Sequence, residues 1–359
     1  MDKLHVLFII QRLTGGGAER VCLSIANGLS LKGHDVSILT RRLSKEDYPV
    51  ESSIEVYETS GRNFIERRFD YYSKVIRIVR SKNIDIVINV LNNYPAETAM
   101  ICHLLGVKCV FSDHNSYERP QEAPFNAREY LLKHFVIKLY NYTTVLTERD
   151  KYVLNNRDDV EVMPNPLFLE PLPRIPSKNK NIVAVGRLNV WYTKGFDVLI
   201  KAWGKICKKY PDWNLRIVGE GTNVEHERIK GFIINSHAER VSIVPFRKDI
   251  EEEYKNAEVF VLSSRFEGFG LVLIEAMSQR CACIACDFLT RQRDIVTDGV
   301  DGLICPVNDV ESLAEKIDRV LSDEELRGYL QNNSTVNLSR YRESNITLMW
   351  ERFLNRIVS

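Results

Sequence analysis

The chain has 359 residues, 44% of them hydrophobic, and a formal net charge of +1. This length favours two domains over one, and the composition excludes a disordered chain and a nucleic-acid role driven by overall charge. No apolar run approaches the roughly 18 residues of a membrane-spanning helix. Residues 4–10 are apolar, but three glycines and a charged pair follow them, which indicates a first strand and not a signal peptide.

The first half of the chain alternates short apolar runs with a helical pattern. The pattern predicts a helix at residues 19–31 and strands at 4–10, 35–40, 84–90, 107–112 and 143–146. Strands and helices that alternate with short links predict a parallel sheet covered by helices on both faces.

Five prolines then fall between residues 164 and 176, which is the densest run of prolines in the chain. Proline cannot continue a helix or a central strand, so this segment is the predicted linker between two domains. We therefore expect one domain at residues 1–168 and another at 178–339.

The alternation restarts after this linker. A helix is predicted at residues 196–209, and strands at 182–185, 215–218, 241–244, 259–262, 281–285 and 303–305. A last helix at 344–358 has an apolar face formed by Ile346, Met349, Trp350, Phe353 and Ile357, and the segment 340–359 is expected to pack back on the first domain. Ligands of open parallel sheets bind beyond the carboxyl ends of the strands, so two such edges would form a cleft.

Eight cysteines are present, and three of them cluster at Cys281, Cys283 and Cys286. A metal site is the sharper hypothesis, but these cysteines alternate with Ala and Ile and have no neighbouring histidine. The pattern favours a buried strand with free thiols in a reducing compartment.

Three glycines follow the first strand and open the first helix. Gly15, Gly16 and Gly17 would let a ligand approach the backbone, and a helix N-terminus favours a phosphate or a sugar hydroxyl. A plain tight turn is the alternative. The spacing is not the dinucleotide fingerprint, and the second strand lacks the acid that would bind a ribose, which disfavours a dehydrogenase.

The most informative segment contains two acids eight residues apart. Glu267 lies in a glycine-containing loop, and Glu275 lies in an apolar helix that is expected to begin near Gly270. Eight helical residues span at most about 12 Å, which is close to the separation of the hexose and the ribose in a sugar nucleotide. A carboxylate can accept hydrogen bonds from several hydroxyls, although two solvated acids beside a structural helix would show the same spacing.

Four motifs in this order resemble the retaining glycosyltransferase family 4. They are Gly15-Gly16-Gly17-Ala18-Glu19-Arg20, Gly186-Arg187-Leu188 followed by Lys194-Gly195, the Glu267 to Glu275 spacing, and Gly299-Val300-Asp301-Gly302-Leu303. The resemblance covers nearly the whole chain. It implies an α/β chain of GT-B fold, in which two Rossmann-like domains with parallel sheets face a central cleft.

The resemblance assigns donor binding to the second domain. It implies that Arg187 and Lys194 hold the donor diphosphate and stabilise the charge of the leaving nucleoside diphosphate. Glu275 would bind the ribose and Glu267 the transferred sugar. No Asp-x-Asp motif occurs in the chain, so no metal and no cofactor are expected, and the nucleotide sugar is a co-substrate.

Further contacts follow from the resemblance. His114 would meet the donor sugar near the reacting carbon, with Asp113 beside it as a weaker candidate, and Gly16 and Gly17 would approach the donor. Phe246 would frame the base, although Arg247 stands where relatives often have glycine. The backbone of Gly268, Phe269, Gly270 and Leu271 would contact the sugar or the phosphates. After Asp287 the chain has Phe288-Leu289-Thr290-Arg291-Gln292 where the family is commonly glycine-rich, which leaves the sugar open.

A basic stretch in the first domain points to the acceptor. Residues 62–82 carry seven basic and two acidic side chains, a net charge of +5, interleaved with aromatic and aliphatic residues. A basic amphipathic helix can bind anionic lipid, or it can simply pack its apolar side on the sheet. We expect peripheral attachment to the inner face of the cytoplasmic membrane and an acceptor saccharide linked to polyprenyl diphosphate.

The sequence thus predicts a retaining transferase of cell-surface polysaccharide assembly, of the kind that builds O-antigen or capsule. It would move a hexose or N-acetylhexosamine from a UDP-sugar, and no nucleic acid would bind. Two alternatives are a sugar-nucleotide epimerase on the same architecture and a non-catalytic sugar-nucleotide-binding protein. The basic first domain argues against the epimerase, and the joint presence of His114, Arg187, Lys194, Glu267 and Glu275 argues against the binding protein.

Overall fold

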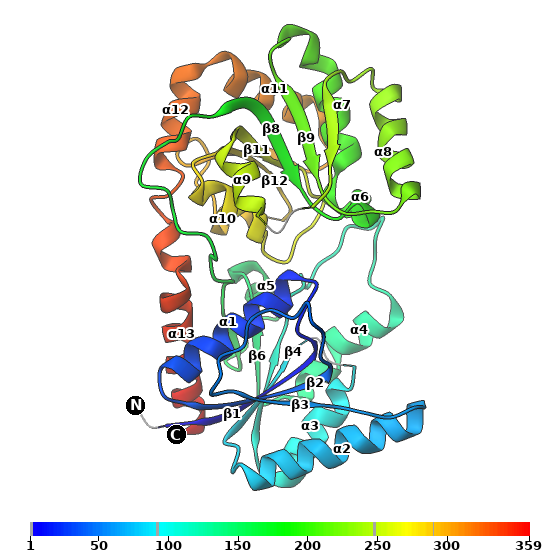
Figure 1. The fold of residues 1–359 in the computed structure, drawn as a ribbon, viewed down its shortest axis with the longest axis vertical. Coiled ribbons are helices and arrows are strands. Elements are labelled where there is room, and N and C mark those ends of the chain that lie inside the picture. The colour runs from blue at the N-terminus through cyan, green and yellow to red at the C-terminus, as the bar shows by residue number, and fades with distance from the viewer. Residues whose placement is uncertain (1–2, 91–92, 247–248, 290) are drawn as a thin grey trace. The chain divides into compact units, whose positions relative to one another are not determined.

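The computed structural model describes residues 3–90, 93–246, 249–289 and 291–359. The chain divides into two compact units (Figure 1). Unit 1 comprises Met1–Pro166 with Tyr341–Ser359, and unit 2 comprises Leu167–Arg340. Each unit contains one parallel sheet with its own buried hydrophobic cluster.

The sheet of unit 1 has seven parallel strands in the order β3-β2-β1-β4-β5-β6-β7. The central strands are buried along almost their whole length, as expected for a parallel sheet covered on both faces. The strands are β1 (His5–Arg12), β2 (Asp35–Arg42), β3 (Glu55–Glu58), β4 (Ile86–Val90), β5 (Lys108–Ser112), β6 (Tyr142–Val145) and β7 (Val160–Val162).

Two helices of unit 1 begin at an Asn cap. The Asn63 side chain accepts from the Glu66 amide at the start of α2, and Asn126 forms a capping box with Glu129 at the start of α4. The helices are α1 (Gly17–Leu31), α2 (Phe64–Ser81), α3 (Pro95–Leu105), α4 (Ala127–His134), α5 (Glu148–Val153) and α13 (Glu343–Val358), with a 3₁₀ turn at Val136–Leu139.

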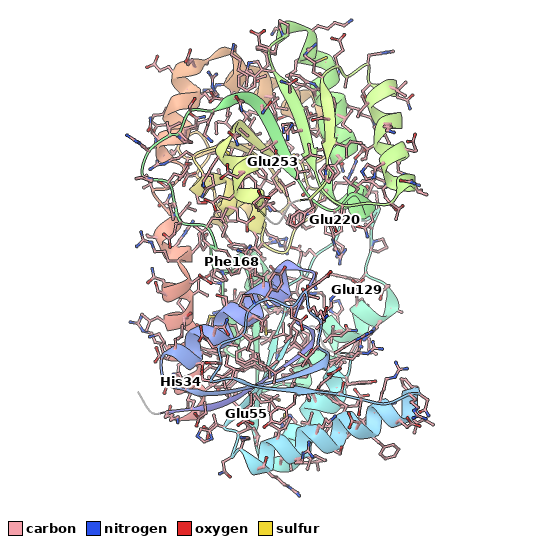
Figure 2. All side chains as sticks on the ribbon, viewed as in Figure 1. His34, Glu55, Glu129, Phe168, Glu220 and Glu253 are labelled. Carbon is pink, nitrogen blue, oxygen red and sulfur yellow. The ribbon has the colours of Figure 1, made fainter. Side chains whose placement is uncertain are left out.

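The C-terminal helix α13, red in Figure 1, packs against α1. The Ser24 hydroxyl donates to Glu343 over 2.6 Å. The Leu4 amide donates to Nδ1 of His34, so Nε2 carries the ring proton and donates to Glu351 over 3.3 Å. His34 is labelled in Figure 2. An exposed contact at Ser24 and a buried one at His34 therefore hold α13 against the rest of unit 1.

Helix α2 divides its apolar side chains between the core and the surface. Tyr71, Val75, Ile78 and Val79 are buried against the sheet, so part of the apolar side packs inward. By contrast, side chains in the first two turns of the helix remain exposed, namely Phe64, Ile65 and Phe69 at 62%, 65% and 70%.

The sheet of unit 2 has six parallel strands in the order β10-β9-β8-β11-β12-β13. They are β8 (Asn179–Val185), β9 (Asn214–Val218), β10 (Val241–Val244), β11 (Ala257–Leu262), β12 (Ala282–Asp287) and β13 (Leu303–Pro306). The helices are α6 (Trp191–Lys194), α7 (Phe196–Ile206), α8 (Asn223–Asn235), α9 (Ile250–Lys255), α10 (Leu271–Ser278), α11 (Val310–Ser322) and α12 (Glu324–Asn333). Helix α7 buries Phe196 and Trp203 in the core of this unit.

The predicted parallel α/β class is confirmed, and each predicted strand is present. Three details differ from expectation. The helix predicted at 196–209 ends at Ile206 and continues as a 3₁₀ turn, Met349 is 37% exposed and does not belong to the buried face of α13, and the edge strands β3 and β7 were not predicted.

The cysteine cluster lies in and just before β12, as the buried-strand interpretation predicted. Cys281, Cys283 and Cys286 are all buried, and their thiols are free. Burial raises the pKa of Cys281 to about 11, so its thiol stays protonated at neutral pH. Within the described part of the chain, no group of three or more His, Cys, Asp or Glu side chains is arranged to hold a metal, and no helix is long and apolar enough to cross a membrane.

Candidate active site

A lysine–glutamate pair lies beyond the ends of two neighbouring strands in unit 2. Lys194 ends α6, after β8, and Glu267 lies in the loop after β11, which pairs with β8. The Lys194 ammonium donates to Glu267 Oε1 over 2.6 Å, and the Ser264 hydroxyl donates to the same oxygen over 2.7 Å. Both side chains of the ion pair are largely buried, at 18% and 14% exposure. A positive charge and a carboxylate are thus held together at the sheet edge that binds ligands in parallel folds.

Close backbone packing positions Lys194. Gly195 has a φ of +63°, and a Cβ there would lie 1.9 Å from the Ser263 carbonyl oxygen, so only glycine fits. The Ser263 hydroxyl donates to the Lys194 carbonyl over 2.8 Å. A Cβ at Gly186 would lie 2.9 Å from Cγ of Lys194, so that glycine makes room for the lysine stem. These glycines explain why the loops after β8 and β11 can meet.

A buried ion pair fixes the loop that carries Glu267. Both terminal nitrogens of Arg265 donate to the Asp197 carboxylate, over 2.7 and 2.8 Å, and Nε donates to Asn308 over 2.6 Å. The guanidinium lies 4.1 Å from the centre of the Tyr192 ring. The sequence analysis missed this network, because Asp197 lies 68 residues from Arg265 along the chain.

The Arg187 guanidinium is exposed and free. It begins the 3₁₀ turn Leu188–Val190, directly after β8 and Gly186. Among the residues that the structure describes, it has no hydrogen-bond or ion-pair partner. A fixed backbone with a free guanidinium suits the binding of phosphate oxygens.

Helix α10 presents an open N-terminus. Gly270 precedes it with a φ of 100°, and no side chain caps the helix. Phe269 is buried at 3% exposure, which leaves the backbone of the glycine loop as the group available to a ligand. Glu275, on the second turn, is 6% exposed and accepts a 3.3 Å hydrogen bond from the Tyr254 hydroxyl. Nothing in the sequence pointed to Tyr254.

The remaining unit 2 motifs fall into two kinds. Phe246, just after β10, is 47% exposed and can therefore stack on a base, while Arg247 and Thr290 lie outside the described residues. Asp301, in the late glycine turn, is fully buried and accepts from the Thr297 amide over 2.7 Å. That turn is a structural element of unit 2.

His114 lies in a polar loop after β5 in unit 1. Its Nε2 is 3.3 Å from the Ser112 hydroxyl, and its buried Nδ1 has no hydrogen-bond partner among the residues described. Burial lowers the pKa of His114, while the Asp113 carboxylate, a polar contact with the Asn165 side chain and the Glu19 carboxylate oppose this shift. The imidazole is therefore neutral at pH 7.

Glu19, on α1 directly after the glycine loop, is one of the carboxylates that raise the pKa of His114. This residue is 6% exposed and accepts from Nε of Arg12 over 3.0 Å. A Cβ at Gly16 would lie 2.3 Å from Glu19 Oε2, so a larger residue there would displace the Glu19 carboxylate. Asn165, also buried, has an unpartnered side-chain oxygen. The sequence analysis did not select Asn165, because a single Asn between prolines is typical of a linker.

A buried pair supports the His114 loop. Lys133 on α4 donates to Asp113 over 2.7 Å and to the Asn115 carbonyl over 3.1 Å, and both charged side chains are at most 5% exposed. Its ammonium lies 3.8 Å from the centre of the Tyr117 ring. Asp113 is thus a positioning group for the loop.

Comparison with known proteins identifies the class of the chain. The family described as Glycosyl transferases group 1 matches residues 170–336, and Glycosyltransferase Family 4 matches residues 15–170. The chain is a glycosyltransferase. Of the three functions predicted from the sequence, this assignment favours the transferase over the epimerase and the non-catalytic binding protein.

Relatives resemble this glycosyltransferase over nearly its whole length. An uncharacterized glycosyltransferase of Haemophilus influenzae is 28% identical over 97% of this chain and 98% of its own. The amylovoran biosynthesis glycosyltransferase AmsD of Erwinia amylovora is 28% identical over 95% and 96%. The Campylobacter jejuni GalNAc-alpha-(1->4)-GalNAc-alpha-(1->3)-diNAcBac-PP-undecaprenol alpha-1,4-N-acetyl-D-galactosaminyltransferase is 25% identical over 99% of each chain.

Solved structures establish the fold. Sucrose-phosphate synthase from Thermosynechococcus elongatus superposes with a TM-score of 0.81 at 17% identity, covering 99% of each chain. HepE from Anabaena, solved in complex with UDP, gives 0.81 at 17% identity over 98% of this chain and 100% of its own. The glycosyltransferase therefore has the GT-B fold that the resemblance implied.

The structure groups the predicted residues by unit. Unit 2 brings Lys194 and Glu267 into direct contact, and the Arg187 guanidinium, in the same strand-end region, has no partner within the described ranges. Unit 1 carries Gly16, Gly17 and His114. The roles predicted for these residues, and the expectation that no metal takes part, remain predictions.

Proposed function

We propose that this glycosyltransferase moves a hexose or N-acetylhexosamine from a UDP-sugar, with retention of configuration, to a saccharide carried on a polyprenyl diphosphate. The observation that carries the proposal is the 2.6 Å contact between Lys194 and Glu267. It combines a cation for a phosphate with a carboxylate for sugar hydroxyls at the strand ends of one sheet. Such a pair suits a ligand in which a sugar and a phosphate are joined.

Each donor residue has a distinct part in this proposal. Arg187 and Lys194 would hold the diphosphate and stabilise the negative charge that develops as the sugar leaves. Glu267 would accept hydrogen bonds from the transferred sugar, and Glu275 from the ribose, with Tyr254 orienting its carboxylate. Phe246 would stack on the base.

The reaction is a substitution on one face of the sugar. The bond between the anomeric carbon and the phosphate oxygen breaks, and the acceptor oxygen bonds to that carbon from the same side. The acceptor hydroxyl passes its proton to the leaving phosphate oxygen. His114, whose imidazole is neutral, would orient the donor sugar by a hydrogen bond.

The relatives support the donor and the acceptor. The Campylobacter jejuni N-acetylgalactosaminyltransferase is named for an acceptor on undecaprenol diphosphate, and AmsD is named for amylovoran biosynthesis. HepE binds UDP in its crystal structure. On this basis we assign the protein to cell-surface polysaccharide assembly.

Transfer from candidate donors tests the proposal. The protein is incubated with UDP-GalNAc, UDP-GlcNAc, UDP-galactose and GDP-mannose in the presence of a disaccharide on undecaprenyl diphosphate, and the product anomer is read by NMR. We expect transfer from a UDP-sugar with retention, lost in Glu267→Gln and kept in Lys180→Met, a change in an exposed surface pair. Transfer from the GDP-sugar alone, or an inverted product, would contradict the proposal.

We also propose peripheral attachment to an anionic membrane through the start of α2. Phe64, Ile65 and Phe69 are exposed there on a helix of net positive charge. Flotation with anionic vesicles tests this attachment: Phe69→Ser should lower the bound fraction, and Tyr329→Ser, which changes another exposed aromatic, on α12, should not. Equal binding of both variants would contradict it.

A further inference from the structure

Unit 1 contains a cavity of about 430 Å³ at one edge of its sheet. The cavity lies at the carboxyl ends of β1 and β2 and against the first turns of α2 and α3. This is the edge at which parallel sheets bind ligands, and the volume is within the range of about 300–1,000 Å³ for small-molecule sites. None of the residues predicted for the donor lines it.

The charge of this cavity is strongly positive. Arg41, Arg67, Arg68 and Arg128 line it, against the single carboxylate of Glu97. Arg68 donates to Glu97 over 2.7 Å and is thereby neutralised. Among the residues that the structure describes, the other three guanidinium groups have no carboxylate partner. Arg67 donates to the Arg62 carbonyl over 3.2 Å and Arg128 to the carbonyl and side-chain oxygens of Asn93 over 3.4 and 3.5 Å, so three positive charges without a carboxylate partner line one small space.

Two polar groups in the lining lack the partners that burial requires. Thr40, on β2, is 1% exposed, and its hydroxyl has no hydrogen-bond partner in the described structure. The Nε of Arg67 is also buried and without a partner. Each atom has less than 1 Å² of accessible surface, so a ligand in the cavity would contact the other polar atoms of the lining and not these two.

The geometry of the guanidinium hydrogen-bond donors indicates which class of ligand the cavity binds. A guanidinium offers parallel donors that match the oxygens of a phosphate or a carboxylate. Phe64, Tyr71 and Tyr94 supply aromatic walls, on which the apolar face of a sugar can stack. The cavity thus suits an anionic group joined to a saccharide.

We propose that this cavity binds an anionic group of the acceptor, either a phosphate or a sugar carboxylate, through Arg41, Arg67 and Arg128. The assignment to the acceptor rests on the proposed function, while anion binding by the cavity does not. The arginines of α2 thus fall into two groups: Arg67 and Arg68 line the cavity, whereas the exposed Arg77 does not.

Calorimetric titration tests the proposal. The protein carries Arg187→Gln and Lys194→Met, so that the donor site cannot bind phosphate, and it is titrated with pyrophosphate, glucuronate and glucose. We expect one of the two anions to bind, at least 10-fold more weakly after Arg41→Gln or Arg128→Gln, and glucose not to bind. Pyrophosphate binding identifies a phosphate site, and glucuronate binding identifies a carboxylate site.

Two matched controls keep the result specific. Arg42→Gln changes the neighbour of Arg41 on β2, and Arg77→Gln changes another arginine of α2; neither side chain lines the cavity. Both should leave anion binding within 2-fold. No binding of either anion, or an equal loss in the controls, would overturn the proposal. Binding of UDP to the wild-type protein, measured separately, reports on the proposed function alone.

Discussion

At the scale of single residues, the contact between Lys194 and Glu267 should decide turnover. Lys194→Met removes the cation that would stabilise the leaving diphosphate and leaves Glu267 partly buried without its charge partner. Loss of one such group lowers kcat by about 10²–10³-fold in enzymes that use fixed charges. Steady-state transfer rates measure this, with Lys180→Met as the surface control. A decrease in kcat smaller than 3-fold would show that Lys194 does not act in catalysis.

His114 should make stability depend on pH. Because burial lowers its pKa in the folded protein, the unfolded chain binds more protons as the pH falls below about 6.5. The free energy of unfolding of the wild type should therefore decrease there, relative to His114→Gln, and the difference should be constant above pH 7. Urea unfolding between pH 5 and 8 measures it. A variant that loses stability in parallel with the wild type would show that His114 does not titrate in this way.

The charged residues of the site were predictable from the sequence, but the residues that hold them in position were not. Lys194 and Glu267 stand in recognisable motifs, because their chemistry constrains the local chain. Tyr254, Asn165 and the Arg265–Asp197 pair have no local signal. Their partners are distant in the sequence, so only the folded chain identifies them.

At the scale of elements, Gly195 allows the loop after β8 to pack closely against the loop after β11. Gly195→Ala would force a Cβ to within 1.9 Å of the Ser263 carbonyl oxygen at a positive φ. We expect the free energy of unfolding to fall by about 2–4 kcal/mol, the range of severe single substitutions. Urea unfolding of unit 2 measures this change.

Gly231→Ala is the matched control. It lies within α8 and has open space around the new methyl group, so it should be neutral or stabilising by up to about 1 kcal/mol. Equal effects of the two alanines would show that the loops do not meet as described.

Element boundaries were the less predictable part of the fold. The 12 Å span expected between Glu267 and Glu275 treats all eight residues as helical, whereas α10 begins at Leu271. Only the steps from Leu271 to Glu275 rise as a helix, which is about 6 Å. The strands β3 and β7 were missed because both are short edge strands with no continuous apolar run.

At the scale of the whole molecule, the last helix belongs to the unit formed by the beginning of the chain. Trp350 on α13 is 1% exposed, and Trp350→Ala should destabilise unit 1 by about 3–5 kcal/mol. Amide hydrogen exchange should accelerate in β1 and β4 and not in β8 and β11. The neighbouring Met349→Ala, at a 37% exposed position, should change the exchange little. Faster exchange in β8 would contradict the division into units.

The sequence was sufficient for the two-sheet plan of the molecule. Alternating apolar runs predicted parallel sheets because strands buried on both faces must be apolar throughout. The cavity of unit 1 was not predictable, since Arg41, Arg67 and Arg128 come from three separate elements. Their convergence is a property of the strand order, and no spacing in the sequence encodes it.

A calorimetric titration of the protein with UDP tests the donor site of unit 2 most directly. We expect binding that weakens about 10- to 100-fold in Glu275→Gln, because a hydrogen bond to a charged group contributes about 1.5–3 kcal/mol. Glu311→Gln, which changes an exposed carboxylate of unit 2, should bind UDP as the wild type does. Absence of UDP binding to the folded wild type, or binding unchanged in Glu275→Gln, would contradict the assignment of the donor to unit 2.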